Sequence, residues 1–351
     1  MRRILVVGLS GMMLSANVCA HHSFAPHYDA SKQVSISGKI TEFERRNPHA
    51  YLHVLAPDGD GVMHEYVCES HGVTQLERNG ISTEMLAPGT LVTLTGSQAR
   101  RDPYRCFFNL VTFADGTTLN VNGPDGRGPT EAGSVARIAV PLRDSMFGSW
   151  LLVPANRSTS GPQPMLDFLT PAGEAATATY DPFTDDPTFR CEPVGIRRVW
   201  FAPGTPMAIE QRGDDIVLRH EWMDVARTIH MNQAAVPDDT PPSVLGYSRG
   251  HYEGDTLVIE TSHYSAGVMS QYVEQPGKPT RGMLHSAALT SVERLRFNPD
   301  SQRVELTMEF SDPEYFTRDF PAARAEYGAT TMVIKPFGCR PENADHSLRN
   351  P

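Results

Sequence analysis

The feature that most constrains the fold is a succession of short alternating segments separated by turns rich in glycine and aspartate. Apolar and polar side chains alternate along short stretches of residues 33–121, and a second series of such stretches fills residues 206–310. Alternation with a period of two is typical of strands with one buried face, and turns at close, regular spacing are typical of antiparallel sheets. The sequence therefore predicts an all-β protein.

The first series has the element order of an OB-like barrel. A short helix is expected from Gly72 to Asn79, with Gly80 as its C-cap, because Val73, Leu76 and Glu77 have helical spacing. Three strands before this helix and two after it are typical of a five-stranded OB-like barrel. The expected strands are 34–43, 50–56, 62–69, 91–96 and 106–113.

The second series predicts a larger β domain. Residues 123–146 begin with a turn-rich, unpatterned run and are interpreted as a linker, so the second domain comprises residues 147–351. Apart from a short helix at 171–180, we expect regular hairpins, which favour a lipocalin-like antiparallel barrel or a sandwich. The expected strands are 206–211, 216–223, 227–232, 245–252, 256–262, 291–297 and 304–310.

The N-terminal residues 1–20 have the features of a secretory signal peptide. Arg2 and Arg3 precede an apolar run that is too short to span a membrane, and small residues end at Ala20. Cleavage there would leave residues 21–122 as the first domain and the protein in the periplasm. A lipoprotein anchor at Cys19 is the alternative.

The charge of the chain excludes several partners. The formal charge is -10, and it becomes -12 when the signal peptide is removed. An acidic chain without basic runs is a poor candidate for binding nucleic acid or anionic lipid. No other apolar stretch approaches the roughly 20 residues of a membrane helix.

Four cysteines remain after cleavage, and an even number in an exported chain favours disulfides with three possible connectivities. We expect Cys68–Cys106 and Cys191–Cys339, because each pair would then close one domain.

The segment HHSFAPHYDASKQVSISGKITEFERRNPHAYLHV resembles the opening of a proteobacterial family of exported proteins of unknown function. Further pieces, among them DDPTFRCEPVG, GHYEGDTLVIET and SDPEYFTRDF, resemble a companion domain found in the same secreted proteins. The resemblance implies membership of this family and no established activity. Cys191 and Cys339 fall on its cysteine positions.

Seven of the thirteen histidines lie between His21 and His71, which suggests a metal site. A mature N-terminal His21 would offer an amine and an imidazole together, and these groups suit Cu(II). We expect His49, in the Asn-Pro-His motif, to complete a copper site, with His22 and His27 as secondary candidates. The alternative is that these histidines are hydrogen-bonded, partly buried residues.

Several polar residues of the second domain could line a barrel interior and bind a ligand: Arg227, Tyr247, His251, His285 and Glu293. Arg294 would then point outward, because neighbouring strand residues face opposite sides.

Two local motifs have weaker interpretations. His220 and His230 would lie opposite each other if residues 224–226 formed a three-residue hairpin loop. The sequence around Ser248 matches G-x-S-x-G, but the expected antiparallel pattern favours a strand residue over a nucleophile.

Together these observations predict an exported periplasmic protein that binds a small ligand, with copper at the mature N-terminus. The alternative is a periplasmic enzyme: a copper-dependent oxidoreductase, or an isomerase or hydrolase acting in the C-terminal barrel.

Overall fold

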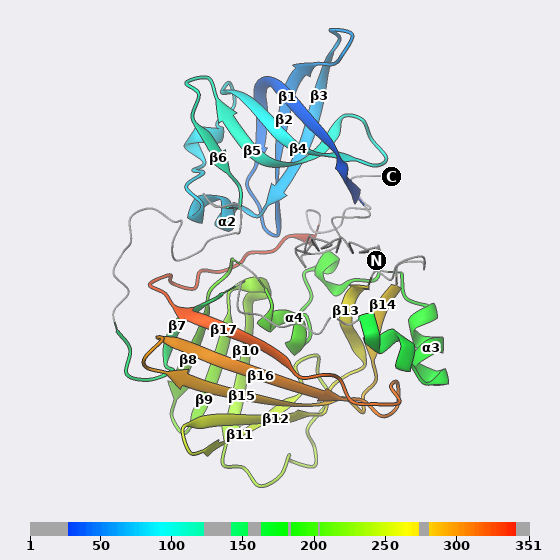
Figure 1. The fold of residues 1–351 in the computed structure, drawn as a ribbon, viewed down its shortest axis with the longest axis vertical. Coiled ribbons are helices and arrows are strands. Elements are labelled where there is room, and N and C mark those ends of the chain that lie inside the picture. Colours follow the sequence, from blue (N-terminus) through cyan, green and yellow to red (C-terminus); the bar gives the residue numbers. More distant parts are fainter. Residues whose placement is uncertain are drawn as a thin grey trace, which may run out of the picture.

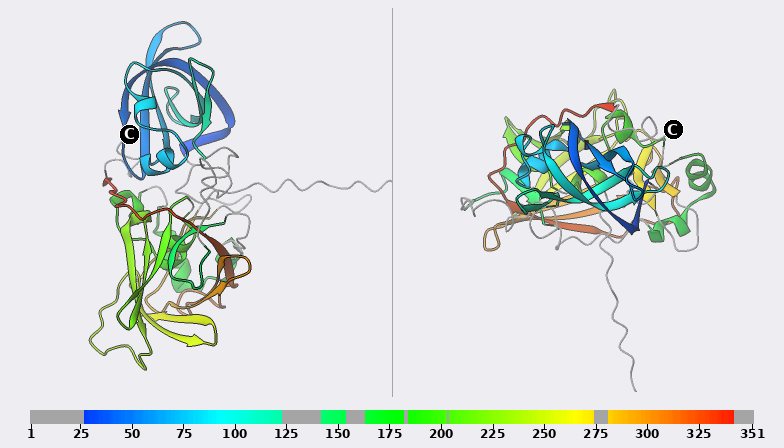
Figure 2. Two further views of the ribbon diagram at one scale, coloured as in Figure 1. Left: turned by 90° about the vertical axis from the view of Figure 1, so that its left-hand side faces the viewer. Right: turned by 90° about the horizontal axis from the view of Figure 1, so that it is seen from above.

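The computed structural model describes residues 27–122, 142–153, 163–181, 184–202, 204–273 and 281–341. These residues form a mostly β protein with two bodies, a six-stranded sheet and a closed nine-stranded barrel, which lie one above the other (Figures 1 and 2). A two-stranded sheet and a few short helices complete the larger body. The prediction of a mostly β protein with a closed barrel is therefore confirmed. The expected signal peptide and most of the expected linker lie outside the described residues.

The N-terminal sheet has the strand order β3-β2-β1-β4-β5-β6. A parallel pairing of β3 with β5 joins the first and fifth strands of this order, so the sheet curls back on itself. The predicted helix is present as α2, and Gly80 follows it with a φ of 82°, a conformation that glycine adopts without strain. The elements are β1 (Tyr28–Glu44), β2 (His49–Pro57), β3 (Met63–His71), α2 (Val73–Arg78), β4 (Leu91–Ala99), β5 (Arg105–Phe113) and β6 (Thr118–Asn120).

Alternation along β2 and β3 separates two faces of this sheet. Leu52, Val54 and Cys68 point into an apolar core. Cys68 is bonded to Cys106 on β5, with a Cα–Cα distance of 4.5 Å, so the first expected disulfide is confirmed. The disulfide lies where the two strands pair in parallel.

The larger body is a closed barrel with the order β10-β11-β12-β15-β16-β17-β7-β8-β9. All its neighbouring pairs are antiparallel except β10 and β11. These two strands are parallel because the connection between them, residues 232–246, returns to the starting end of the barrel before β11 begins. The strands are β7 (Gly148–Leu152), β8 (Met207–Arg212), β9 (Asp215–His220), β10 (Val225–Met231), β11 (Tyr247–Glu253), β12 (Thr256–Ser262), β15 (Thr290–Asn298), β16 (Arg303–Ser311) and β17 (Ala323–Ala329).

The remaining elements cover one end of the barrel (Figure 1). The sequence predicted α3 but not α4, β6, β7, β13, β14 or β17, because these segments are short or lack a clear alternation. The smaller body therefore has six strands where five were expected. The elements that cover this end of the barrel are α3 (Pro171–Ala178), α4 (Ile196–Trp200), β13 (Gly267–Val273) and β14 (Arg281–His285).

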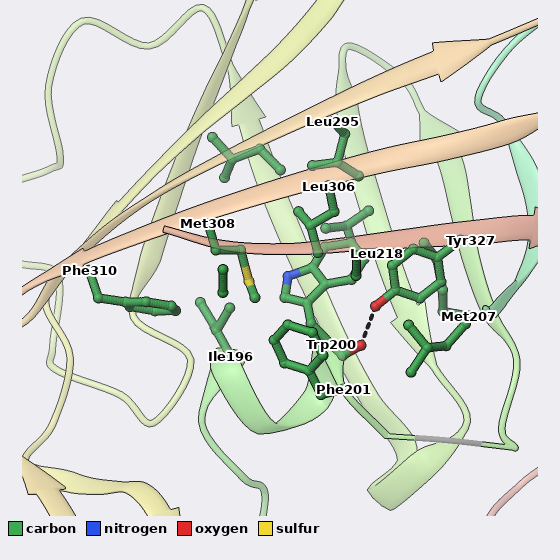
Figure 3. Close-up of a cluster of buried hydrophobic side chains, with 14 of the residues drawn as sticks. Ile196, Trp200, Phe201, Met207, Leu218, Leu295, Leu306, Met308, Phe310 and Tyr327 are labelled. Carbon is green, nitrogen blue, oxygen red and sulfur yellow. Dashed lines mark hydrogen bonds between the residues drawn. The ribbon is translucent and has the colours of Figure 1, made fainter. Parts of the chain in front are cut away.

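The interior of the barrel is filled by side chains, and α4 inserts Trp200 among them (Figure 3). The indole N–H of Trp200 donates to Glu293, and its carbonyl accepts a hydrogen bond from Tyr327. Arg227 donates to both oxygens of Glu293 at 2.6 and 2.9 Å. Apolar side chains surround this group, so the interior is a packed core.

The C-terminal segment joins the two bodies. Cys339 is bonded to Cys191, with a Cα–Cα distance of 5.7 Å, which confirms the second expected disulfide. Asn47 donates to the Phe337 carbonyl at 2.7 Å and accepts from the Arg340 amide at 3.2 Å. The segment therefore contacts the loop that leads into β2.

A buried ion pair makes a second connection between the bodies. Arg78, at the end of α2, donates to both oxygens of Glu221 at 2.5 and 2.6 Å. Glu221 is fully buried, and it also accepts from the Lys335 amide at 3.0 Å. The carboxylate of Glu221, a residue of the large body, thus binds both the small body and the C-terminal segment.

We expect Arg227→Met to lower the free energy of unfolding by about 3–5 kcal/mol, because it leaves the Glu293 carboxylate buried without its cation. The double variant Arg227→Met/Glu293→Leu removes both charges and should lose much less. Chemical denaturation of the three proteins measures this difference. Equal losses in the single and double variants would contradict the prediction.

Candidate functional site

The main candidate site lies on the outer face of β2 and β3, on the side of the strands opposite the apolar core. In the register of these antiparallel strands His49 lies opposite His71, and Tyr51 lies opposite Glu69. Three of the four are almost inaccessible, with exposed fractions of 3% for His49, 2% for Tyr51 and 1% for Glu69. An outer strand face that is both polar and buried is unusual, since exposed faces normally carry the polar residues.

The carboxylate of Glu69 is the centre of this site. Tyr28, at the start of β1, donates to Glu69 Oε2 at 2.5 Å, and His49 Nδ1 lies 2.8 Å from Oε1. We call His27, Tyr28, His49, Glu69 and His71 the Glu69 cluster. Three segments that are separate in the chain supply it: the start of β1, the start of β2 and the end of β3.

Burial keeps two imidazoles of the cluster uncharged. It lowers the pKa of His71 to about 4, against a smaller opposing effect of the hydrogen bond to Asn122, whose oxygen lies 2.6 Å from His71 Nε2. Burial also lowers the pKa of His27. Burial, and then the charge of Glu69, raise the pKa of Tyr28 well above its usual value. At neutral pH these two histidines are therefore neutral, which is the form that binds metals.

The carboxylate of Glu69 lies beside one of the two nitrogens of His49, Nδ1. A carboxylate beside Nδ1 favours the proton on that nitrogen and leaves the lone pair on Nε2. Histidines that bind metals commonly carry this kind of carboxylate partner on the other nitrogen. By contrast, His53 Nε2 lies 2.9 Å from Glu44, so this histidine of β2 belongs to a different ion pair.

The other expected metal ligands, His21 and His22, lie outside the described residues. Within the described part of the chain, no group of three or more histidine, cysteine, aspartate or glutamate side chains could hold a metal ion. Of the four candidate ligands the structure describes His27 and His49, both in the Glu69 cluster, and it adds Glu69 as the partner of His49.

The five expected ligand-binding residues of the larger barrel do not come together. Arg227 and Glu293 are inside and bind each other, while Arg294 points outward to Glu309 at 3.0 Å. Tyr247 and His251 lie on the outer face of β11, so the expectation that they line the interior is wrong. Their neighbours Ser248 and Gly250 are the residues of this strand that face inward.

His285 is the fifth of these residues, and it lies at the covered end of the barrel. It is buried on β14, its Nδ1 donates to the Ser286 carbonyl at 3.0 Å, and its ring lies 6.0 Å from that of Tyr264. Burial lowers its pKa. His285 therefore borders a different region from Arg227 and Glu293.

The expected opposition of His220 and His230 is wrong. The strands β9 and β10 are joined by a four-residue turn at residues 221–224, which begins three residues earlier in the chain than expected. In this turn Met223 and Asp224 have φ values of 59° and 52°. This turn pairs His220 with Val225 instead. His220 consequently faces the interior, and His230 lies outside.

Ser248 is a strand residue, as the sequence predicted. It is buried on β11, and its hydroxyl lies 2.9 Å from that of Thr261. The strand continues to Glu253 and is followed by β12, so the helix that a nucleophile elbow requires does not follow.

Sequence reasoning missed Tyr28 and Glu69. The alternation of β3 places Glu69 on the same face as His71, and this was the available indication. Burial of that face could not be deduced from it, because an outer strand face is usually exposed to solvent.

Comparison with known proteins gives one match. A model of a family of unknown function (DUF6152) matches residues 11–105, which include β1 to β4 and the whole Glu69 cluster. No curated protein matches the chain. No solved structure matches it either. No helix of the described residues is long and apolar enough to cross a membrane.

The interior histidine gives a pH prediction. Burial, and to a smaller extent Arg227, lower the pKa of His220 to about 3 from 6.5. Below pH 6.5 the unfolded chain binds a proton here that the folded protein does not. The free energy of unfolding should therefore fall toward pH 3, by about 1.4 kcal/mol per pH unit from this residue.

In His220→Phe this contribution disappears, so its stability should fall less steeply with acid than that of the wild type. Urea denaturation between pH 7 and pH 4.5 measures both slopes. Parallel slopes would contradict the prediction.

Proposed function

We propose that this is an exported periplasmic protein that consists of an OB-like barrel and a lipocalin-like barrel. The pairing of β3 with β5 in the smaller body, and the closed barrel of the larger one, support these fold assignments. The two disulfides support an oxidising compartment. The expected signal peptide supports export.

We further propose that the smaller barrel binds copper. The observation that carries this proposal is the 2.8 Å contact between His49 Nδ1 and the buried carboxylate of Glu69, since it prepares Nε2 as a metal ligand. The amine and imidazole of a mature N-terminal His21 supply the other nitrogens, with His22 as the alternative imidazole. Nitrogen ligands of these two kinds are those that Cu(II) prefers.

The proposal is consistent with the position of the cluster in the chain. His27 and Tyr28 belong to it, and only five residues separate His27 from His21. A segment of this length, fully extended, reaches up to about 20 Å. The N-terminal amine is therefore within reach of His49.

Catalysis at the proposed copper site is a second candidate function. Copper held by an amine and imidazoles is a redox centre, and Tyr28 would place a phenol close to it, hydrogen-bonded to Glu69. A copper-dependent oxidoreductase is accordingly the enzyme that the Glu69 cluster favours. The filled interior of the larger barrel gives no corresponding support for an isomerase or hydrolase.

The copper proposal predicts stoichiometric binding to mature protein purified from the periplasm, whose first residue has been verified by sequencing. After incubation with Cu(II) and gel filtration, elemental analysis should find about one copper per chain. His21→Ala and His49→Ala should each lose it. Electron paramagnetic resonance of the wild type should show nitrogen ligands.

The matched control is His53→Ala, which removes an imidazole from the same strand and should leave copper binding unchanged. A second control carries an additional N-terminal methionine, which moves the amine away from His21 and should abolish the site. Wild-type protein without copper after exposure to Cu(II) would end the proposal, as would equal binding by His49→Ala.

Glu69 should act as a positioning residue for copper. We expect Glu69→Gln to weaken copper affinity about 10- to 100-fold, because the amide no longer holds the proton on His49 Nδ1 with a full charge. Competition with a chelator measures the affinity. Electron paramagnetic resonance distinguishes a repositioned ligand from a lost one. The spectrum of the variant should have altered copper parameters but show the same number of coordinated nitrogens.

A further inference from the structure

The feature that carries a further inference is the Cys191–Cys339 disulfide, because the segment that it holds contacts both bodies. The C-terminal segment, residues 330–340, follows β17 and runs in red between the smaller body and the barrel (Figures 1 and 2). It contains no helix or strand of its own. Its position therefore depends on contacts with the two bodies.

Most of the C-terminal segment packs loosely. Of residues 331–340, only Phe337 is buried, and Val333 is 73% exposed. A cavity of about 550 Å³ lies beside residues 330–334 and separates this part of the segment from the barrel. Burial of apolar surface thus holds the segment at one residue.

Carboxylates of the larger body bind the backbone of the segment. The Lys335 amide donates to Glu221 at 3.0 Å, and the Phe337 amide donates to Asp224 at 2.8 Å. Such bonds contribute modestly to stability, because both partners bond to water when the segment opens. The disulfide is the covalent link that prevents opening.

The segment meets the smaller body at Cys339 itself. Cys339 forms an isolated bridge with Asn47, which lies two residues before β2. Asn47 donates to the Phe337 carbonyl at 2.7 Å and accepts from the Arg340 amide at 3.2 Å. The contacts with the smaller body therefore lie on both sides of the disulfide.

The two disulfides of the protein differ in exposure. Cys68 and Cys106 have exposed fractions of 0% and 1%, whereas Cys191 and Cys339 are both partly exposed. Reduction requires a thiolate to reach one of the sulfurs, so its rate depends on access. A reductant can therefore attack Cys191–Cys339 in the folded protein while the other disulfide is protected.

We propose that Cys191–Cys339 is a redox latch on the junction between the two bodies, and that a dithiol opens it. One thiolate of the dithiol attacks a sulfur of the bond, so a mixed disulfide forms and the other cysteine leaves as a thiolate. The second thiol of the dithiol then displaces the remaining cysteine. The bond gains two electrons and the two protons of the dithiol, and the dithiol becomes a disulfide.

Reduction leaves the segment held by its hydrogen bonds and by Phe337 alone. The C-terminal segment then opens more often, and each opening breaks the contacts with Asn47. The loop before β2 loses this support at the same time.

The first test is selective reduction of the full mature chain by dithiothreitol at pH 7 without denaturant. Alkylation followed by mass spectrometry should find Cys191 and Cys339 as thiols and Cys68–Cys106 intact. Reduction of Cys68–Cys106 at the same rate or faster would overturn the proposal.

Amide hydrogen exchange in the same reductant measures the opening. Exchange should be at least about 10-fold faster at Phe337 and Arg340 than in the oxidised protein. It should also be faster at the Val73 amide, which donates to the carbonyl of Arg46 in the loop before β2 at 3.1 Å. The amides of β16 should exchange at their former rate. Unchanged exchange at Phe337 and Arg340 after selective reduction would overturn the latch.

The matched control is Cys191→Ser/Cys339→Ser, which lacks the latch and keeps the other disulfide. Without reductant it should exchange like the reduced wild type, and dithiothreitol should have no further effect. An equal response of this variant to dithiothreitol would show that another bond is responsible. If the variant does not fold, the comparison of the oxidised and the selectively reduced wild type decides alone.

The consequence for copper rests on the proposed function. The double serine variant, measured without reductant, should bind Cu(II) about 10-fold more weakly than the wild type, since His49 follows the loosened loop. Unchanged affinity would overturn the link between the latch and His49. A wild type that binds no copper would end the copper proposal only, because the exchange measurements test the latch independently.

Discussion

The buried carboxylate of Glu293 is the interaction on which the larger barrel depends. A charge at the centre of an apolar core is tolerated only when its oxygens are fully bonded, and Arg227 and Trp200 together supply these bonds. Trp200 belongs to α4, so the same interaction draws this helix into the barrel. The interior becomes a packed core as a result.

A second buried carboxylate, that of Glu221, connects the two bodies. Glu221 binds Arg78 of the smaller body and the Lys335 amide of the C-terminal segment. The same segment contacts Asn47, two residues before His49, and is tied to its own barrel by the Cys191–Cys339 bond. The entry to β2, and with it the Glu69 cluster, is therefore supported by residues nearly three hundred positions away in the chain.

Much of the architecture was predictable, because strand alternation is a local property. Five of the six strands of the smaller body, helix α2 and both disulfides agree with patterns that lie within one domain. The prediction for His220 and His230 was wrong because the turn lies at residues 221–224, with left-handed conformations at Met223 and Asp224, and not at residues 224–226. This difference shifts the register of the two strands. Similarly, Tyr247 and His251 are on the outer face because the register of β11 assigns its inward positions to Ser248 and Gly250.

The sequence by itself determined the mostly β fold class, and it indicated the expected pairing of the cysteines and His49 as a residue of interest. Only the tertiary structure decided which polar groups meet. Tyr28 and Glu69 join His49 because three strand ends converge on one buried face, and Trp200 reaches Glu293 because α4 enters the barrel. Both results depend on burial, which arises from the packing of segments distant in the chain and leaves no periodic pattern in the sequence.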